Sequence, residues 1–160
     1  MSIIRVLILG AATLISFGGA STAAADDVAV IVNKANLAVG ALTMTQLRKI
    51  VLGQESKWPD GKKIAVLMTS GGQAERESTL KTVCGMSETD FTLHFMHASF
   101  NGASVDPPKA FGSGLLVRQA VAAAATAVGF IRASQLDDSV KVIAIEGSSP
   151  GQPAYKLKLK

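Results

Sequence analysis

The apolar residues of this 160-residue chain fall into short continuous runs separated by stretches with helical spacing. Runs rich in branched residues occupy 28–32, 64–68, 128–131 and 140–145, and polar or glycine-containing segments bound each of them. Continuous apolar runs of this length are typical of strands buried on both faces of a sheet. Their alternation with helical patterns predicts an α/β domain in which helices cover a central mixed sheet.

Two of the helical stretches carry recognisable starts. Thr43 is followed by Gln46, and Ser87 by Asp90, at the three-residue spacing of a capping box. Helices are therefore predicted to begin after Thr43 and after Ser87, and Gly53 is predicted to end the first of them. Further expectations are helices over 72–84 and 115–125, and a loop over 99–114.

The first 25 residues have the order of a secretory signal peptide. Arg5 is the only charge before Asp26, an apolar run follows it, and Ala23-Ala24-Ala25 supplies small residues for cleavage after Ala25. A membrane-spanning helix is the alternative, but the run is short for a bilayer and glycines interrupt it. The leader predicts export to the periplasm or beyond the cell. No second long apolar run follows, so no integral membrane segment is expected after cleavage.

Composition narrows the choice of partners for the remaining chain. The formal net charge is +4 and aromatic residues make up 5%, with basic residues scattered rather than clustered. A nucleic-acid-binding domain would gather basic and stacking side chains on one surface, so no nucleic acid is expected as a partner. Residues 26–147 are predicted to form one α/β domain. Residues 148–160 read as a linker and a basic tail that is an edge strand, a frayed end or a surface-binding segment.

Candidates for catalysis or metal binding find little support. His94 and His97 lie three residues apart on one predicted helix, but no further ligand stands at a convincing spacing. Ser70 lacks a G-x-S-x-G elbow, and the lone Cys84 falls on the apolar face of its helix. The chain is therefore predicted to hold no metal or cofactor and not to be an enzyme.

A binding site is expected where the strand over 64–68 delivers a small-residue loop into a helix. Free N–H groups of a first helical turn, hydroxyls and an arginine fork suit a small oxyanion such as phosphate. The alternative is that these residues are ordinary caps and that Arg76 pairs with Glu77 or Glu88. The candidate ligand-binding residues are Thr69, Ser70, Gly71, Gly72, Gln73, Arg76 and Ser113.

Several short motifs in order resemble the phosphate-binding-protein-like members of the type 2 periplasmic binding protein superfamily. The resemblance covers roughly residues 28–145. The segments that carry it are Leu47–Gly53, Trp58-Pro59-Asp60-Gly61, Glu75-Arg76-Glu77 with Leu80, Gly85-Met86-Ser87, Phe100-Asn101-Gly102, Pro107-Pro108 and Val128–Ile131.

This resemblance implies an α/β lobe of a receptor in which two lobes close on an oxyanion, with the chain supplying a single lobe. It also implies a link to ABC-type uptake. Thr69 stands where the family typically has an arginine, and Gln73-Ala74-Glu75 replaces its Ser-Gly-Thr. Two hypotheses follow: an exported solute-binding module, or a degenerate lobe that acts as a protein-interaction or accessory module of the cell envelope without a small ligand.

Overall fold

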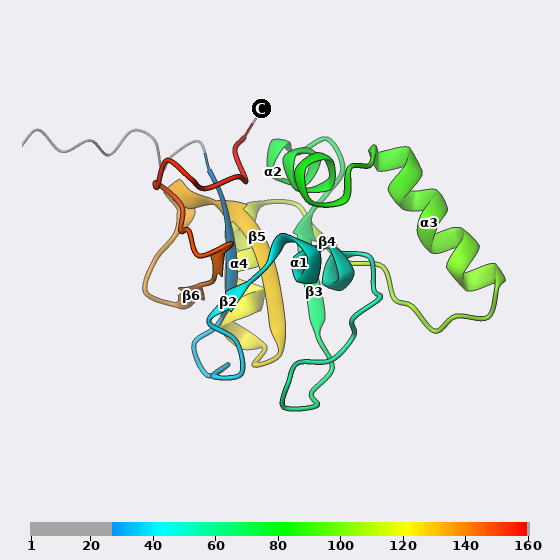
Figure 1. Cartoon of the computed structure of the whole chain (residues 1–160), viewed down its shortest axis with the longest axis horizontal. Coiled ribbons are helices and arrows are strands. Elements are labelled where there is room, and N and C mark those ends of the chain that lie inside the picture. Colours follow the sequence, from blue (N-terminus) through cyan, green and yellow to red (C-terminus); the bar gives the residue numbers. More distant parts are fainter. Residues whose placement is uncertain (1–26, 160) are drawn as a thin grey trace, which may run out of the picture.

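A computed structural model of the chain describes residues 27–159, and the predicted signal peptide lies outside these described residues. A five-stranded mixed sheet forms the centre, with helices on both of its faces (Figure 1). The predicted α/β fold with a central mixed sheet flanked by helices is confirmed. In spatial order the strands are β4 (Lys109–Phe111), β3 (Ala65–Thr69), β5 (Ala127–Arg132), β1 (Val28–Asn33) and β6 (Val140–Val142).

The directions of the strands determine at which edge of the sheet the loops that follow them meet. β4, β3 and β5 run parallel, whereas β1 lies antiparallel between β5 and β6. Thr69 at the end of β3 pairs in register with Phe111 at the end of β4. The carboxyl ends of parallel strands meet at one edge of a sheet, which is the usual location of ligand sites in such folds. The loops after Thr69 and Phe111 are therefore neighbours, whereas the helices that follow them pack into the apolar clusters on opposite faces of the sheet.

Capping residues position the helices as the sequence predicts. α1 (Met44–Val51) begins at Thr43 and α3 (Glu88–Phe100) begins at Ser87, each with both hydrogen bonds of a capping box. Gly53, just beyond α1, has a positive φ of 71°, which a glycine adopts without steric cost. The helices that follow β3 and β4 are α2 (Ala74–Thr79), continued by the π-helical turn η1 (Leu80–Cys84), and α4 (Gly114–Ala123).

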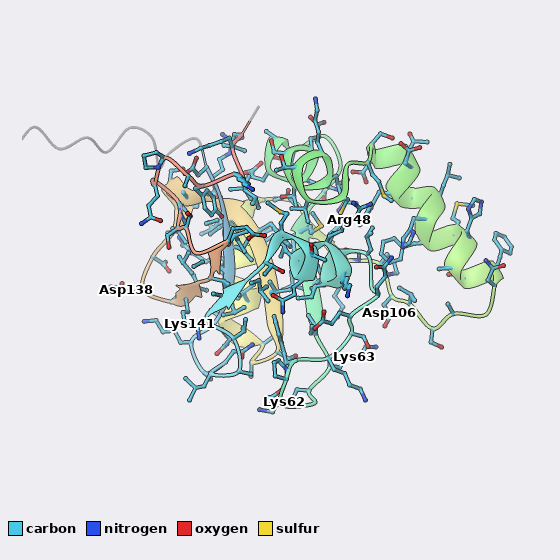
Figure 2. All side chains as sticks on the ribbon, viewed as in Figure 1. Arg48, Lys62, Lys63, Asp106, Asp138 and Lys141 are labelled. Carbon is cyan, nitrogen blue, oxygen red and sulfur yellow. The ribbon has the colours of Figure 1, made fainter. Side chains whose placement is uncertain are left out.

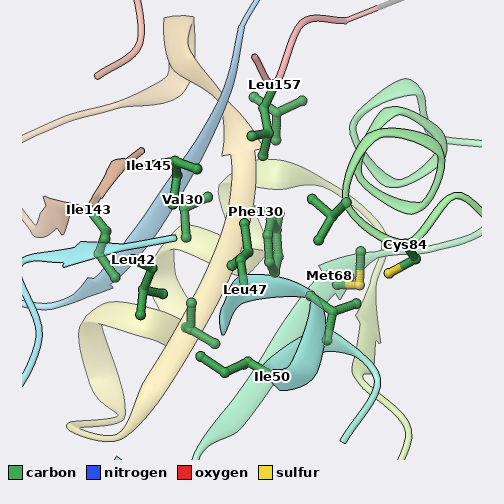
Figure 3. Close-up of a cluster of buried hydrophobic side chains, with 14 of the residues drawn as sticks. Val30, Leu42, Leu47, Ile50, Met68, Cys84, Phe130, Ile143, Ile145 and Leu157 are labelled. Carbon is green, nitrogen blue, oxygen red and sulfur yellow. The ribbon is translucent and has the colours of Figure 1, made fainter. Parts of the chain in front are cut away.

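Two apolar clusters hold the layers together. Side chains of β1 alternate between them: Val30 faces the cluster beneath α1, whereas Ile31 faces the cluster beneath α4. Both side chains are fully buried, as expected for a strand in a sheet that is covered on both faces. Figure 3 shows the larger cluster, in which Met68 of β3 and Cys84 of η1 lie close together. Cys84 is a free, buried thiol, as the sequence predicts.

The structure departs from the sequence-based expectations in local details. The helix expected over 72–84 begins at Ala74 and changes to π geometry from Leu80 onward. The segment 99–114, expected to be a loop, contains β4, and the strand expected over 140–145 is divided into β6 and β7 (Ala144–Ile145). β7 pairs with the two-residue strand β2 (Ala41–Leu42). A 3-10 turn, η2 (Ala133–Gln135), follows β5.

The C-terminal segment lies against the first strand. The Val28 N–H donates to the Leu157 carbonyl at 2.8 Å, and the Tyr155 hydroxyl donates to the Val28 carbonyl at 2.6 Å. Lys158 forms an ion pair at 2.7 Å with Asp27, whose side chain is fully buried. Tyr155 and Leu157 belong to the same apolar cluster as β1, so this basic segment contributes to the fold up to its last described residues.

Candidate functional site

The candidate site lies at the carboxyl edge of β3 and β4. The Ser70 N–H and the Ser70 hydroxyl both donate to the Phe111 carbonyl, at 2.8 and 3.0 Å. This double contact ties the loop after β3 to the end of β4. Gly71 and Gly72 follow as an exposed turn, and Gly72 has a φ of 83°, where a side chain would be strained.

Backbone donors of this turn are available to a ligand. The N–H groups of Gly71 and Gly72 have no acceptor among the described residues, whereas the Gln73 N–H donates to the Ser70 carbonyl at 3.3 Å. Gln73 is the N-cap of α2 but makes no side-chain capping bond. A short, exposed row of free N–H groups therefore stands beside the end of β3.

Arg76 reaches back beneath this turn and is held by an acid. Its Nε and Nη2 donate to the two carboxylate oxygens of Glu88, both at 2.7 Å, and its Nη1 donates to the Thr69 carbonyl at 3.2 Å. The guanidinium also lies 5.5 Å from the centre of the Phe91 ring. Arg76 is 8% exposed, whereas the Glu88 side chain is 41% exposed, so the bidentate pair is buried on the arginine side and open to water on the glutamate side. Of the partners that the sequence left open, Glu88 is the one that the structure selects.

Glu75, which would repel an anion if it faced the loop, is turned into the protein. It is 3% exposed, and its Oε1 accepts from Arg132 Nε at 2.8 Å. Its other oxygen has no hydrogen-bond partner among the described residues. The edge thus carries two arginines and two glutamates in two ion pairs, and their charges cancel. Sequence reasoning named Glu88 but missed Arg132, which stands at the end of β5.

The remaining predicted residues lie at the same edge without converging on one point. Thr69 is buried and its hydroxyl has no partner among the described residues. Ser113 caps α4, its Oγ accepting from the Leu116 N–H at 3.3 Å, and no hydrogen bond joins it to the loop after Thr69 in the described part of the chain. The structure therefore brings Ser70, Gly71 and Arg76 together and leaves Ser113 as a neighbouring cap.

Hollows in the surface flank the Arg76–Glu88 pair. One, of about 560 Å³, has Arg76 at one end and apolar side chains of α3 along its length. Another, of about 520 Å³, is bounded by Glu88 and the residues of the turn before it. A smaller cavity of about 320 Å³ lies at the amino ends of β3 and β4, away from the candidate site. Lys63 lines that cavity, and Figure 2 shows it on the loop preceding β3, at the far end of the sheet from α2.

Other reactive side chains are engaged in packing. Burial raises the pKa of the Cys84 thiol to about 11, which keeps it protonated and unreactive at neutral pH. His94 Nε2 lies 3.1 Å from the Leu52 carbonyl, and its ring meets Phe95 edge-on. Among residues 27–159, no cluster of three or more histidine, cysteine or acidic side chains is placed to hold a metal ion.

Comparison with known proteins places this geometry in context. Neither a protein-family model nor a curated protein matches the sequence. Solved structures do match. An ABC-type phosphate transport receptor from Vibrio cholerae is 27% identical, with a TM-score of 0.64 over 78% of this chain and 49% of the receptor. A phosphate ABC transporter substrate-binding protein with bound phosphate, from Clostridium perfringens, is 25% identical, with a TM-score of 0.63 over 78% of this chain and 47% of that protein.

PstS from Borrelia burgdorferi is 12% identical, with a TM-score of 0.66 over 84% of this chain and 55% of that chain, and this likeness concerns the fold alone. The chain spans about half the length of the structural neighbours it matches. The resemblance to substrate-binding proteins of phosphate ABC transporters, predicted from the sequence, is confirmed at the level of structure. These neighbours are binding receptors and not enzymes. Within the described residues, no helix has the length and apolar character needed to cross a membrane.

Proposed function

We propose that this chain is an exported, non-enzymatic solute-binding module that takes a small oxyanion, with phosphate as the leading candidate, at the carboxyl edge of β3 and β4. One observation carries the proposal: the free N–H groups of Gly71 and Gly72 and the buried fork of Arg76 stand together at this edge. The ligand would meet the backbone donors and the guanidinium, and the Ser70 hydroxyl could donate to it only by turning away from the Phe111 carbonyl. The fold shared with phosphate-transport receptors supports this use of the edge.

The same geometry predicts weak binding by the chain alone. Tight small-ligand sites bury most of the ligand, but this turn is exposed and its charged neighbours are balanced. An oxyanion bound here stays partly hydrated, so the Coulomb attraction is screened. A partner surface is therefore part of the proposal. We propose a component of an ABC-type transporter or another envelope protein, which the chain meets in the periplasm or outside the cell after its leader is cleaved behind Ala25.

A titration of the purified chain from residue 26 onward with phosphate, sulfate and acetate, at constant ionic strength, tests the proposal. A ligand that binds only the folded state raises stability by RT ln(1 + [L]/Kd), about 1.4 kcal/mol at ten times Kd. We expect a rise in melting temperature with phosphate that Arg76→Gln abolishes. Arg48→Gln is the matched control, because Arg48 is exposed on α1 and makes no ion pair among the described residues. Equal shifts in both variants, or no shift at millimolar anion, would refute anion capture at this edge.

A second candidate, a protein-interaction module without a small ligand, is favoured by α3. This helix projects from the body of the molecule (Figure 1) and leaves Leu93, Met96 and Phe100 exposed by 41%, 48% and 83%. Their spacing forms one stripe, and exposed apolar stripes are typical of protein contacts. Site-specific crosslinking from Phe100 in cells tests this function. A crosslinked envelope protein that is lost with Met96→Glu would support it, and an absence of crosslinks together with a phosphate-dependent stability shift would exclude it.

A further inference from the structure

We propose that Glu88 is a resident ligand, whose carboxylate occupies the seat beside Arg76 and the Gly71 turn that an external oxyanion would take. The inference rests on the proposed function, because it concerns the same edge of the sheet. It goes further by describing the state of the site: the chain is self-occupied, and an external anion enters by displacing Glu88.

The contact between Arg76 and Glu88 has the form of ligand binding. Both carboxylate oxygens lie 2.7 Å from separate guanidinium nitrogens, in the parallel arrangement that arginine also makes with phosphate and sulfate. A side-chain carbon built on Gly71 would lie 3.8 Å from Cδ and from Oε1 of Glu88. The carboxylate therefore lies close to the glycine turn while its hydrogen bonds go to the guanidinium, so an anion in its place would have the free N–H groups of the turn nearby.

Glu88 is placed so that it can leave without loss of the fold. It is the first residue of α3, but the start of that helix is fixed by the capping box of Ser87 and Asp90, which does not involve the Glu88 side chain. Phe91 and Phe95 attach the helix to the core and are buried. The Glu88 side chain is 41% exposed and borders the hollow of about 520 Å³ formed with the preceding turn. A change of rotamer would therefore move the carboxylate into solvent once an incoming anion takes its place as the charge partner of the buried Arg76.

Self-occupation has a quantitative consequence. When a site is open for only a fraction of the time, the apparent Kd equals the intrinsic Kd divided by that fraction. If Glu88 pairs with Arg76 nine-tenths of the time or more, removal of the carboxylate lowers the apparent Kd by about tenfold or more. The geometry of the Arg76–Glu88 pair defines the class of ligand. It is a small oxyanion with two oxygens that can bind two guanidinium nitrogens at once, such as phosphate, sulfate or a carboxylate.

The experiment compares the wild-type chain with Glu88→Gln and Glu88→Ala. Each is titrated with formate, acetate, sulfate and phosphate by calorimetry and by thermal unfolding, at constant ionic strength. Glu77→Gln and Glu77→Ala are matched controls, because Glu77 is exposed on α2, close in sequence to Arg76, and forms no ion pair among the described residues. We expect Glu88→Gln to bind phosphate about tenfold more tightly than wild type. We expect formate or acetate to stabilise Glu88→Ala by filling the vacated seat, and the Glu77 variants to match wild type.

The outcomes separate this inference from the proposed function. Equal phosphate affinity in wild type and Glu88→Gln overturns the resident-ligand inference and leaves the proposed function standing. Uptake of formate by Glu88→Ala, with no anion bound by wild type, supports the seat and overturns oxyanion capture by the natural chain. Absence of anion binding in every variant overturns both. If Glu88→Ala fails to fold, the isosteric Glu88→Gln decides the question alone.

Discussion

The buried ion pair between Glu75 and Arg132 gives the sharpest prediction about the charge at the candidate site. Glu75 is 3% exposed and holds one oxygen 2.8 Å from Arg132 Nε, while its second oxygen has no partner among the described residues. Arg132→Ala removes the only cation paired with this carboxylate in the described residues. The buried charge of Glu75 is then left uncompensated.

The structure sets the size of the effect. Breaking a fully buried pair by removing one partner costs about 3–5 kcal/mol. The Arg132 side chain is 43% exposed, so water screens part of the interaction, and we expect a loss of roughly 1–3 kcal/mol. Glu75→Gln in the Arg132→Ala background removes the stranded charge and keeps the shape of the side chain. The double variant is therefore expected to regain about 1 kcal/mol relative to Arg132→Ala.

Urea unfolding followed by circular dichroism measures these differences, provided that the slope of the transition stays constant. Lys63→Ala is the control, because its ion pair with Asp106 joins side chains that are 71% and 79% exposed, and no measurable change is expected. A loss below about 0.5 kcal/mol in Arg132→Ala, or no recovery in the double variant, would refute the view that Arg132 neutralises Glu75.

Three further predictions concern the core. Gly129→Ala should destabilise the chain by about 1–3 kcal/mol in urea unfolding, because the added carbon would lie 2.7 Å from Val121 on α4; a neutral result would contradict this close approach. Cys84 should resist iodoacetamide in the folded chain at about pH 8 and react in urea, and rapid labelling of the folded chain would show that the thiol is accessible. Burial, and secondarily the charge of Asp27, raise the pKa of Tyr155 above its ordinary value of 10.0. The protonated hydroxyl therefore contributes to the free energy of unfolding below pH 10.0, and this contribution is lost as the pH rises above that value. Tyr155→Phe should reduce the loss of stability at alkaline pH, and it should lower the free energy of unfolding by about 1 kcal/mol at neutral pH because the hydrogen bond to Val28 disappears. An unchanged loss of stability at alkaline pH would show that Tyr155 is not the titrating group.

Local signals made much of the fold predictable. The capping boxes at Thr43 and Ser87 form as expected, and the apolar runs over 28–32 and 64–68 correspond to the strands β1 and β3. The π-helical turn after Leu80, which packs against α1, was not predicted, because π geometry leaves no periodic signature in the sequence. β4 was missed because it is short and exposed, so it lacks an apolar run.

The sequence predicts which loop carries the candidate site but not how its charged side chains pair, and the binding role of that loop stays a prediction. The strand and the small residues after it locate the edge at Ser70 and Gly71, where the structure finds exposed donors. The partner of Glu75 comes from β5, far away along the chain, and residue spacing carries no information about such a contact. Which acid would hold Arg76 was likewise undecided until the path of the turn before α3 was known.

The position of β1 in the sheet has a consequence for how the chain folds. Although it is the first strand, it is flanked by β5 and β6, and its first N–H is bonded to Leu157. Every one of these neighbours is synthesised roughly a hundred residues later, and such distant contacts slow folding because a long loop must close before any of them forms. β1 can therefore pair with its neighbours only after the residues of β5 and β6 have been synthesised. We expect the domain to fold late and in one cooperative step.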